Sequence, residues 1–312
     1  SAQTAAAAVC SQLPMVDFIE GTVSPDGLLM LLWALAFLAG AKVLSGRLRW
    51  GWALAAATLA AIAVKFPSAA LAPGIVVVVA AAYQRHARWP GTLRGRRLVV
   101  AGIVAAAVVV AVGVIVSGVL AGQLKAAFAL PADHTVRGAI GEFLSYLWQY
   151  YLPRLPWQTK YEMHYAGLPL WTTSFRGYVG AFGWLEVVLA PGVYIAAAVL
   201  AGAALVGGLH SILARARRHV ATILFFLVTA ITLMIGLHWT DYQIIENDQG
   251  HFMQARYLLP LNPLVALVIA AAVGPRLARR PRAQSLALGG VLGGLLALQL
   301  LSLGTVLLRF YG

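Results

Sequence analysis

Charged side chains are scarce in this sequence. Asp, Glu, Lys and Arg make up 11% of the 312 residues, and the acidic residues number ten. Hydrophobic residues make up 61%, and the mean hydropathy is +0.82. A soluble domain of this length could not cover so much apolar surface. The scarcity of charge therefore predicts an integral membrane protein.

Cysteine and the common catalytic motifs are scarce or missing as well. The single cysteine, Cys10, excludes a disulfide within the chain and matches no metal-ligand pattern. The sequence has no Walker motif, dinucleotide fingerprint, nucleophile elbow, HExxH or CxxC. These absences argue against cytosolic nucleotide hydrolysis by this chain.

What the sequence does contain is a series of apolar spans. The hydropathy pattern predicts an all-α membrane protein with about eight transmembrane helices. The expected spans are residues 26–44, 51–64, 68–83, 98–121, 184–208, 220–237, 257–273 and 285–308. Ser24, Pro25 and Asp26 form a helix-start signal before the first span. The second and third spans meet near Lys65, and this predicts a short helical hairpin.

The charges divide between alternate loops. Fourteen arginines and no carboxylate lie in the loops after the first, third, fifth and seventh spans, and all ten carboxylates lie on the other side. By the positive-inside rule, the basic loops are cytoplasmic and both ends of the chain are extracytoplasmic. The net charge of +13 is then a mark of topology and does not predict a nucleic-acid partner.

A long segment without a span divides the chain. We expect an N-terminal membrane part at residues 1–121, an extracytoplasmic loop at 122–183 and a C-terminal membrane part at 184–312. The loop is rich in aromatic residues and predicts amphipathic elements in the membrane interface. Two interpretations stay open: an aromatic belt, or a sugar-binding surface that includes Arg154, Trp157 and Trp184.

Two cations lie at predicted outer ends of spans. Arg256 and Tyr257 stand where a polar run meets an apolar one, and Lys65 stands between two spans. Arg256 could be an interfacial anchor or could bind a phosphate through two parallel hydrogen bonds. Lys65 could extend to the headgroups or contact a lipid phosphate as a point charge.

Acidic residues gather just before Arg256. Asp241, Glu246 and Asp248 could bind a divalent cation or act as acid and base, although a solvated loop is the simpler interpretation. His238 and His251 are too isolated to predict a metal site. The sequence assigns no cofactor and no catalytic residue.

Several motifs in order resemble a known family. They are residues 21–26, Lys65, residues 150–157, residues 175–186 and the stretch Gln254-Ala-Arg-Tyr-Leu-Leu-Pro260. Together they resemble the predicted bacterial membrane proteins grouped as domain of unknown function 2142, over about residues 14–263. One departure is Ala255, where the family pattern often has glycine.

That family is similar to the GT-C-type glycosyltransferases. The resemblance implies a GT-C-like bundle in the bacterial inner membrane that takes a polyprenyl-phosphate sugar donor and a glycan acceptor at the outer face. It implies that Arg256 and Lys65 contact the lipid phosphate. Sugar and acceptor contacts would come from Arg154, Trp157, Trp184, Asp241, Glu246, His251 and Tyr257. In such enzymes the catalytic acid lies in the first outer loop, and we expect this loop to precede the present chain.

Two other functions compete with glycosyl transfer. One is a transporter or flippase for a lipid-linked or polar solute, and the other is a noncatalytic membrane scaffold. The predicted spans lack a series of ionisable residues, which argues against a proton-coupled transporter.

Overall fold

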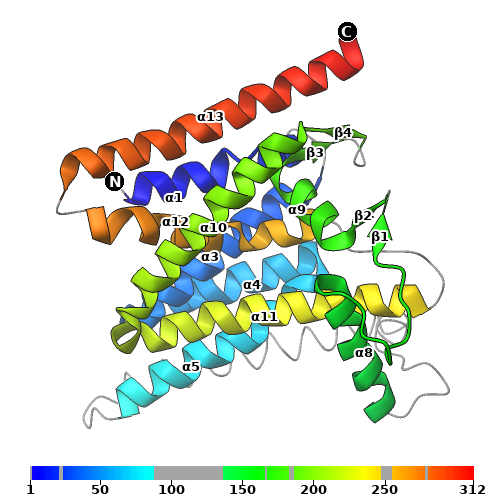
Figure 1. Ribbon diagram of the computed structural model, residues 1–312. Coiled ribbons are helices and arrows are strands. Elements are labelled where there is room, and N and C mark those ends of the chain that lie inside the picture. The colour runs from blue at the N-terminus through cyan, green and yellow to red at the C-terminus, as the bar shows by residue number, and fades with distance from the viewer. Residues whose placement is uncertain are drawn as a thin grey trace. The chain divides into compact units, whose positions relative to one another are not determined.

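The computed structural model describes residues 2–20, 24–87, 136–165, 167–182, 186–246, 255–277 and 280–312. Within these ranges the chain is mostly helical (Figure 1). Six of the described helices are long and apolar enough to cross a membrane. They are Asp26–Leu44, Phe66–Arg85, Pro191–Leu213, His219–Glu246, Ala255–Gly274 and Pro281–Tyr311. The chain is a helical, multi-pass membrane protein.

Six of the eight predicted spans correspond to these candidate helices. The span predicted at residues 51–64 is helix α4 (Gly51–Val64), which has 14 residues. At 1.5 Å per residue it is about 21 Å long, which is short of the ~30 Å hydrocarbon core. The span predicted at residues 98–121 lies outside the described residues.

Helix α3 (Asp26–Leu44) begins as the sequence predicts. The hydroxyl oxygen of Ser24 lies 3.3 Å from the backbone nitrogen of Asp26 and accepts its hydrogen bond. The same hydroxyl donates to Oδ2 of Asp26 over 3.1 Å. A carboxylate at this position also interacts favourably with the positive end of the helix dipole.

The segment between the predicted fourth and fifth spans is well structured where it is described. It contains α8 (Val136–Tyr151), strands β1 (His164–Tyr165) and β2 (Leu168–Pro169), and α9 (Leu170–Gly180). Strands β3 (Ala181–Phe182) and β4 (Val187–Val188) follow. Both strand pairs are antiparallel, and Gly167 in the first turn has a φ of +77°, which favours glycine. Strand β4 falls within the start of the predicted fifth span, and α10 begins later than expected, at Pro191.

The chain divides into two compact units. The first comprises Ser1–Phe37, Phe175–Phe226 and Ala255–Gly312. Its helices include α1 (Ala2–Ser11), α2 (Pro14–Glu20), α10 (Pro191–Leu213), η3 (Ala255–Leu261), α12 (Asn262–Leu277) and α13 (Pro281–Tyr311). Helix α12 packs against α10, α1 and α13 (Figure 1). Helix α12 is thus at the centre of this unit.

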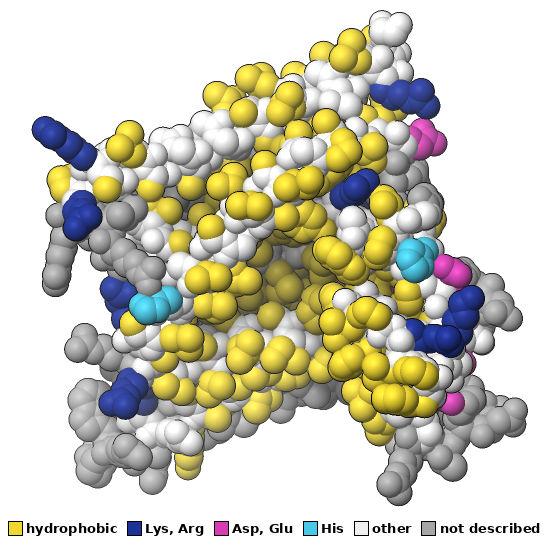
Figure 2. All heavy atoms as spheres, viewed as in Figure 1, with side chains coloured by type: hydrophobic (Ala, Val, Ile, Leu, Met, Phe, Trp, Pro, Cys, Tyr) yellow, Lys and Arg dark blue, Asp and Glu magenta, His cyan; other side chains and the backbone are white. Residues whose placement is uncertain are grey.

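Apolar side chains point outward along two helices of this unit. Within the structure, 11% of the α10 span and 6% of the α13 span are buried, and large exposed side chains include Val199, Leu205, Leu296 and Leu300. Figure 2 shows such side chains spread along the long helices, with charged side chains mainly near their ends. Exposed apolar surface of this extent is suited to lipid.

The second unit comprises Leu38–Ser174 and Leu227–Gln254. It includes η1 (Leu48–Trp50), α4, η2 (Phe66–Ala70), α5 (Leu71–Ala87), α8, β1, β2 and the later part of α11 (Ala216–Glu246). In this unit the guanidinium of Arg85 in α5 donates to the carbonyl oxygen of Leu44. The buried cluster between α8 and α11 forms the candidate site.

Candidate functional site

The candidate site forms where α11 continues past its apolar part. The apolar run ends at Leu237, yet the helix extends to Glu246, about 13 Å further at 1.5 Å per residue. This corrects the solvated-loop interpretation for Asp241, which lies in a helix. Asp241 is 0% exposed and His238 is 1% exposed. These polar residues belong to the helix, and their side chains are buried because α8 covers them.

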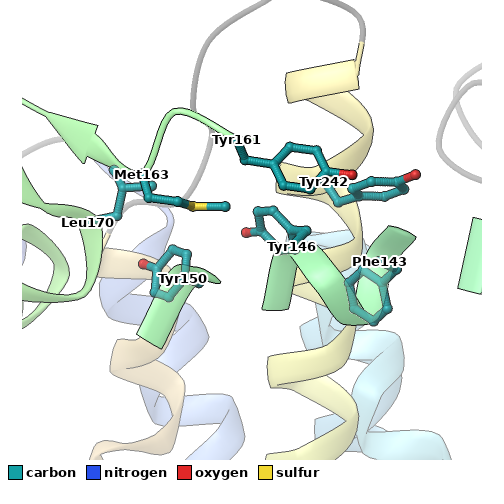
Figure 3. Packing of buried hydrophobic residues seen from close by; sticks show 7 residues of the cluster. All are labelled: Phe143, Tyr146, Tyr150, Tyr161, Met163, Leu170 and Tyr242. Carbon is teal, nitrogen blue, oxygen red and sulfur yellow. The ribbon is translucent and has the colours of Figure 1, made fainter. Parts of the chain in front are cut away.

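Helix α8 contributes an aromatic face to this contact. Its residues Phe143, Tyr146 and Tyr150 are buried, at spacings of three and four that place them on one side of the helix. They form a cluster with Tyr161, Met163, Leu170 and Tyr242 (Figure 3). Trp239 packs against the cluster, and its ring centre lies 5.1 Å from that of Phe143. The cluster surrounds the polar groups with rings.

A chain of hydrogen bonds runs through the cluster. The Tyr146 hydroxyl donates to Oδ2 of Asp241 over 2.7 Å and lies 3.2 Å from Nδ1 of His238. Nε2 of His238 lies 2.8 Å from the hydroxyl of Tyr151. Tyr146 has one hydroxyl proton, and it donates this proton in its hydrogen bond to the carboxylate. Nδ1 of His238 must therefore donate to the Tyr146 oxygen. A neutral imidazole then accepts at Nε2 from Tyr151.

Burial keeps the phenols of this region protonated. It raises the pKa of Tyr146, and the charge of Asp241 and the hydrogen bond to it raise that pKa further. Burial also raises the pKa of Tyr150, partly offset by the hydrogen bond with Ser174. The raised pKa values make both phenols dependable hydrogen-bond donors at neutral pH.

Two more carboxylates lie at the edge of the cluster. Tyr242 donates to Oε2 of Glu142 over 3.1 Å. Burial raises the pKa of Tyr161, followed by the charges of Glu246 and Glu142 and a hydrogen bond with Glu246. Glu246 is exposed, while Glu142 is half-buried. In the described part of the chain, no three His, Cys, Asp or Glu residues are grouped to hold a metal ion.

The structure distributes the predicted sugar-binding residues over both units. Asp241 and Glu246 share α11, but five positions apart they lie on different sides of it. Arg154 and Trp157 lie on an exposed turn between α8 and β1, and Trp157 is 78% exposed. Trp184 and His251, like Asp248, lie outside the described residues.

The two predicted phosphate contacts belong to different units. Lys65 is in the second unit, half-buried, between α4 and η2, with an extended backbone. Arg256 and Tyr257 are in η3 of the first unit. The pairing of Arg256 with Lys65 on one phosphate therefore stays a prediction.

Arg256 lies at the start of a candidate span. Its guanidinium carbon is 5.4 Å from the ring centre of Tyr257, and its Nε is shielded from solvent. Three positions later, Leu259 is fully buried against Met15, Val16, Ile19 and Met30. The packing of Leu259 fixes η3, and with it the position of the Arg256 backbone.

A second arginine, Arg176, lies at the same end of the first unit. Its guanidinium carbon is 5.2 Å from the ring centre of Tyr194, and its buried Nε has no hydrogen-bond partner among the described residues. Tyr178, two positions later in α9, donates to Oδ1 of Asn262 over 3.0 Å, which joins α9 to the start of α12. The sequence marks Arg176 only as one charge in the long loop. Its place in the motif at 175–186 was the available signal.

Comparison with known proteins places the chain in a family without assigning an activity. Searches of the curated proteins and of the solved structures each found no match. A family model described as predicted membrane protein (DUF2142) matches residues 1–265. The match takes in α8, α9, α11 and η3, and with them both arginines and the buried cluster. The chain belongs to this family of predicted membrane proteins, DUF2142.

Proposed function

We propose that this chain is a membrane glycosyltransferase, or the donor-binding part of one, in cell-envelope glycan assembly. Its donor is a polyprenyl-phosphate-linked sugar, and it acts at the extracytoplasmic face of the bacterial inner membrane. The first unit binds the lipid phosphate through Arg256. Arg176, at the same end of this unit, is a second candidate for the contact.

The environment of Arg256 carries the proposal. An arginine that only anchors a helix in the interface extends its charged head into water. Arg256 instead has a solvent-shielded Nε and lies beside the ring of Tyr257. A guanidinium beside an aromatic face still presents its N–H groups in its own plane, where two of them match two phosphate oxygens. These features favour a phosphate contact over an anchor.

The apolar faces of the same unit suit the rest of such a donor. Helices α10 and α13 expose rows of Val and Leu side chains, and α10 begins beside the hairpin that follows α9. A polyprenyl chain along apolar helices and a phosphate at their polar end would match this distribution of side chains.

The expected reaction is an inverting transfer. A carboxylate takes the proton of the acceptor hydroxyl, the hydroxyl oxygen attacks the anomeric carbon, and the polyprenyl phosphate leaves. The arginines stabilise the negative charge that develops on the leaving phosphate. No residue of the chain is assigned as the base for the acceptor.

Donor binding tests the proposal directly. The purified protein in lipid nanodiscs is titrated with a polyprenyl-phosphate sugar, and Arg256→Ala, Arg256→Lys and Arg309→Ala are compared with it. We expect Arg256→Ala to weaken binding by about tenfold or more, because a charge-assisted bidentate contact is lost. Arg256→Lys keeps the charge but loses the second hydrogen bond, so its loss is intermediate.

The control is Arg309→Ala, because Arg309 is exposed near the end of α13. It removes one positive charge and should leave the affinity unchanged. Equal donor binding by the original protein and Arg256→Ala, with equal thermal stability, would overturn the phosphate contact. Absence of donor binding by the original protein would overturn the proposed function itself.

A further inference from the structure

The carboxylate of Asp241 is buried, yet hydrogen bonds connect it to the surface. Asp241 is 0% exposed, and Tyr146 and His238, next in the hydrogen-bonded chain, are 0% and 1% exposed. The last member, Tyr151, is 48% exposed. The heavy-atom separations along the chain are 2.7 Å, 3.2 Å and 2.8 Å. All are within or close to the range of ordinary hydrogen bonds.

We propose that Tyr151, His238 and Tyr146 form a proton path between the solution and the carboxylate of Asp241. This goes beyond the proposed glycosyl transfer and does not depend on it. Asp241 becomes an acid–base group whose proton exchanges with the solution while its side chain stays buried.

The path can move one proton without leaving a charge behind. Tyr146 passes its hydroxyl proton to Oδ2 of Asp241 and takes the Nδ1 proton of His238. The imidazole takes the Tyr151 hydroxyl proton at Nε2, and Tyr151 takes a proton from hydronium. The carboxylate is then neutral, both phenols are restored, and the imidazole has changed tautomer. Release of the proton follows the same transfers in reverse.

The surroundings of His238 restrict it to this path. The rings of Tyr150, Tyr146 and Tyr151 have their centres 4.6, 5.9 and 5.5 Å from the imidazole centre. Both ring nitrogens point at hydroxyl groups, one buried and one exposed. A simple brace between α8 and α11 needs only one of these bonds, whereas proton passage needs both nitrogens.

Other titratable groups lie close to the path. On α8 these are Glu142 and Tyr150, on α11 they are Tyr242 and Glu246, and Tyr161 belongs to the segment that closes the cluster. Burial raises the pKa of Tyr146, so this phenol stays protonated and relays a proton without becoming an anion.

Infrared spectroscopy of the full chain in nanodiscs tests the path. A protonated carboxyl group has a C=O stretching band apart from the carboxylate bands, and the band that Asp241→Asn removes is assigned to Asp241. After a rapid pH jump from about pH 9 to about pH 4, the rise of this band measures proton uptake by the carboxylate. We expect Tyr151→Phe to slow the rise by about tenfold or more and to leave its amplitude unchanged.

The matched control is Tyr165→Phe, because Tyr165 is 51% exposed in β1 and is no member of the path. It should leave the rate unchanged. His238→Gln should slow the rise as Tyr151→Phe does, and the half-exposed Tyr151 keeps the test valid if the histidine variant does not fold. An unchanged rate in Tyr151→Phe, or no band that depends on Asp241 in this pH range, overturns the proposal.

Discussion

The backbone of Gly208 in α10 lies directly against Val268 in α12. A Cβ atom at Gly208 would lie 2.3 Å from the Val268 carbonyl oxygen and 2.6 Å from its Cγ1. Helices in lipid pack closely through such small residues, because van der Waals contact replaces the hydrophobic effect as the main attraction between them. Gly208 therefore sets the distance between the two helices.

Replacing this glycine should separate the helices. We expect Gly208→Ala to lower the free energy of unfolding by about 1–3 kcal/mol, as overpacking does elsewhere. Gly202→Ala is the matched control on the same helix, since a Cβ there meets no atom within 4 Å. Thermal unfolding in detergent measures both. Equal midpoints for the two variants would contradict the close packing at Gly208.

Asn262 joins three segments of the first unit. Its amide nitrogen lies 3.3 Å from the carbonyl oxygen of Val9 and 3.1 Å from that of Cys10, and its Oδ1 accepts from Tyr178. Asn262→Leu removes all three hydrogen bonds at a buried site and should cost about 2–4 kcal/mol of stability. Asn262→Asp retains the acceptor for Tyr178 but places a carboxylate against two carbonyl oxygens.

Chemical denaturation of both variants separates these contributions. If the bonds to α1 dominate, Asn262→Asp should be destabilised at least as much as Asn262→Leu at neutral pH. Tyr178→Phe, which removes only the third bond, should lose about 1 kcal/mol. Full stability of Asn262→Asp would mean that the contacts with Val9 and Cys10 contribute little.

Composition predicted the membrane class and most of the spans, because a lipid solvent demands long apolar helices. It did not predict that α11 continues to Glu246. The polar side chains there form hydrogen bonds with side chains of α8. The hydrogen bond between Tyr146 and Asp241, for example, joins positions 95 apart in the chain. A hydropathy pattern indicates whether a segment is surrounded by lipid or by water. It does not show which distant residues cover the polar side chains of that segment. The spacing of His238, Asp241 and Tyr242, with Tyr146 and Tyr150, was the helical signal that could have been used.

The buried tyrosines predict how stability depends on pH. Burial raises the pKa of Tyr146, Tyr150 and Tyr161 above the usual value of about 10. The folded state then holds these protons more tightly than the unfolded state. Their contribution is fully present below about pH 10 and is lost as the pH rises through the raised values.

An alkaline titration measures this dependence. Tyrosinate absorbance from the three buried phenols should rise only well above pH 10, together with the loss of near-ultraviolet circular dichroism. Tyr146→Phe should make the fall of stability above about pH 10 shallower, because one proton fewer is linked to unfolding. A single ionisation step near pH 10 with the fold retained would contradict this prediction.

The outer face of α8 predicts where this helix lies. Opposite its buried aromatic face, Ile140, Leu144 and Trp148 are 51%, 57% and 41% exposed, and the exposed Leu152 follows the helix. Their spacing of four forms one apolar stripe along the helix. A stripe of this kind beside a half-polar face suits a helix that lies in the headgroup region of a bilayer.

Spin labels can locate this stripe. In a Cys10→Ser background, a label at Leu144→Cys should collide with oxygen, which concentrates in lipid, more often than with a water-soluble nickel chelate. A label at Thr159→Cys, an exposed position in the polar turn before β1, should show the reverse order. If the label at position 144 collides more often with the nickel chelate than with oxygen, as expected at position 159, the stripe lies in solution. Since exposed apolar surface is costly in water, such a result would require that another protein covers it.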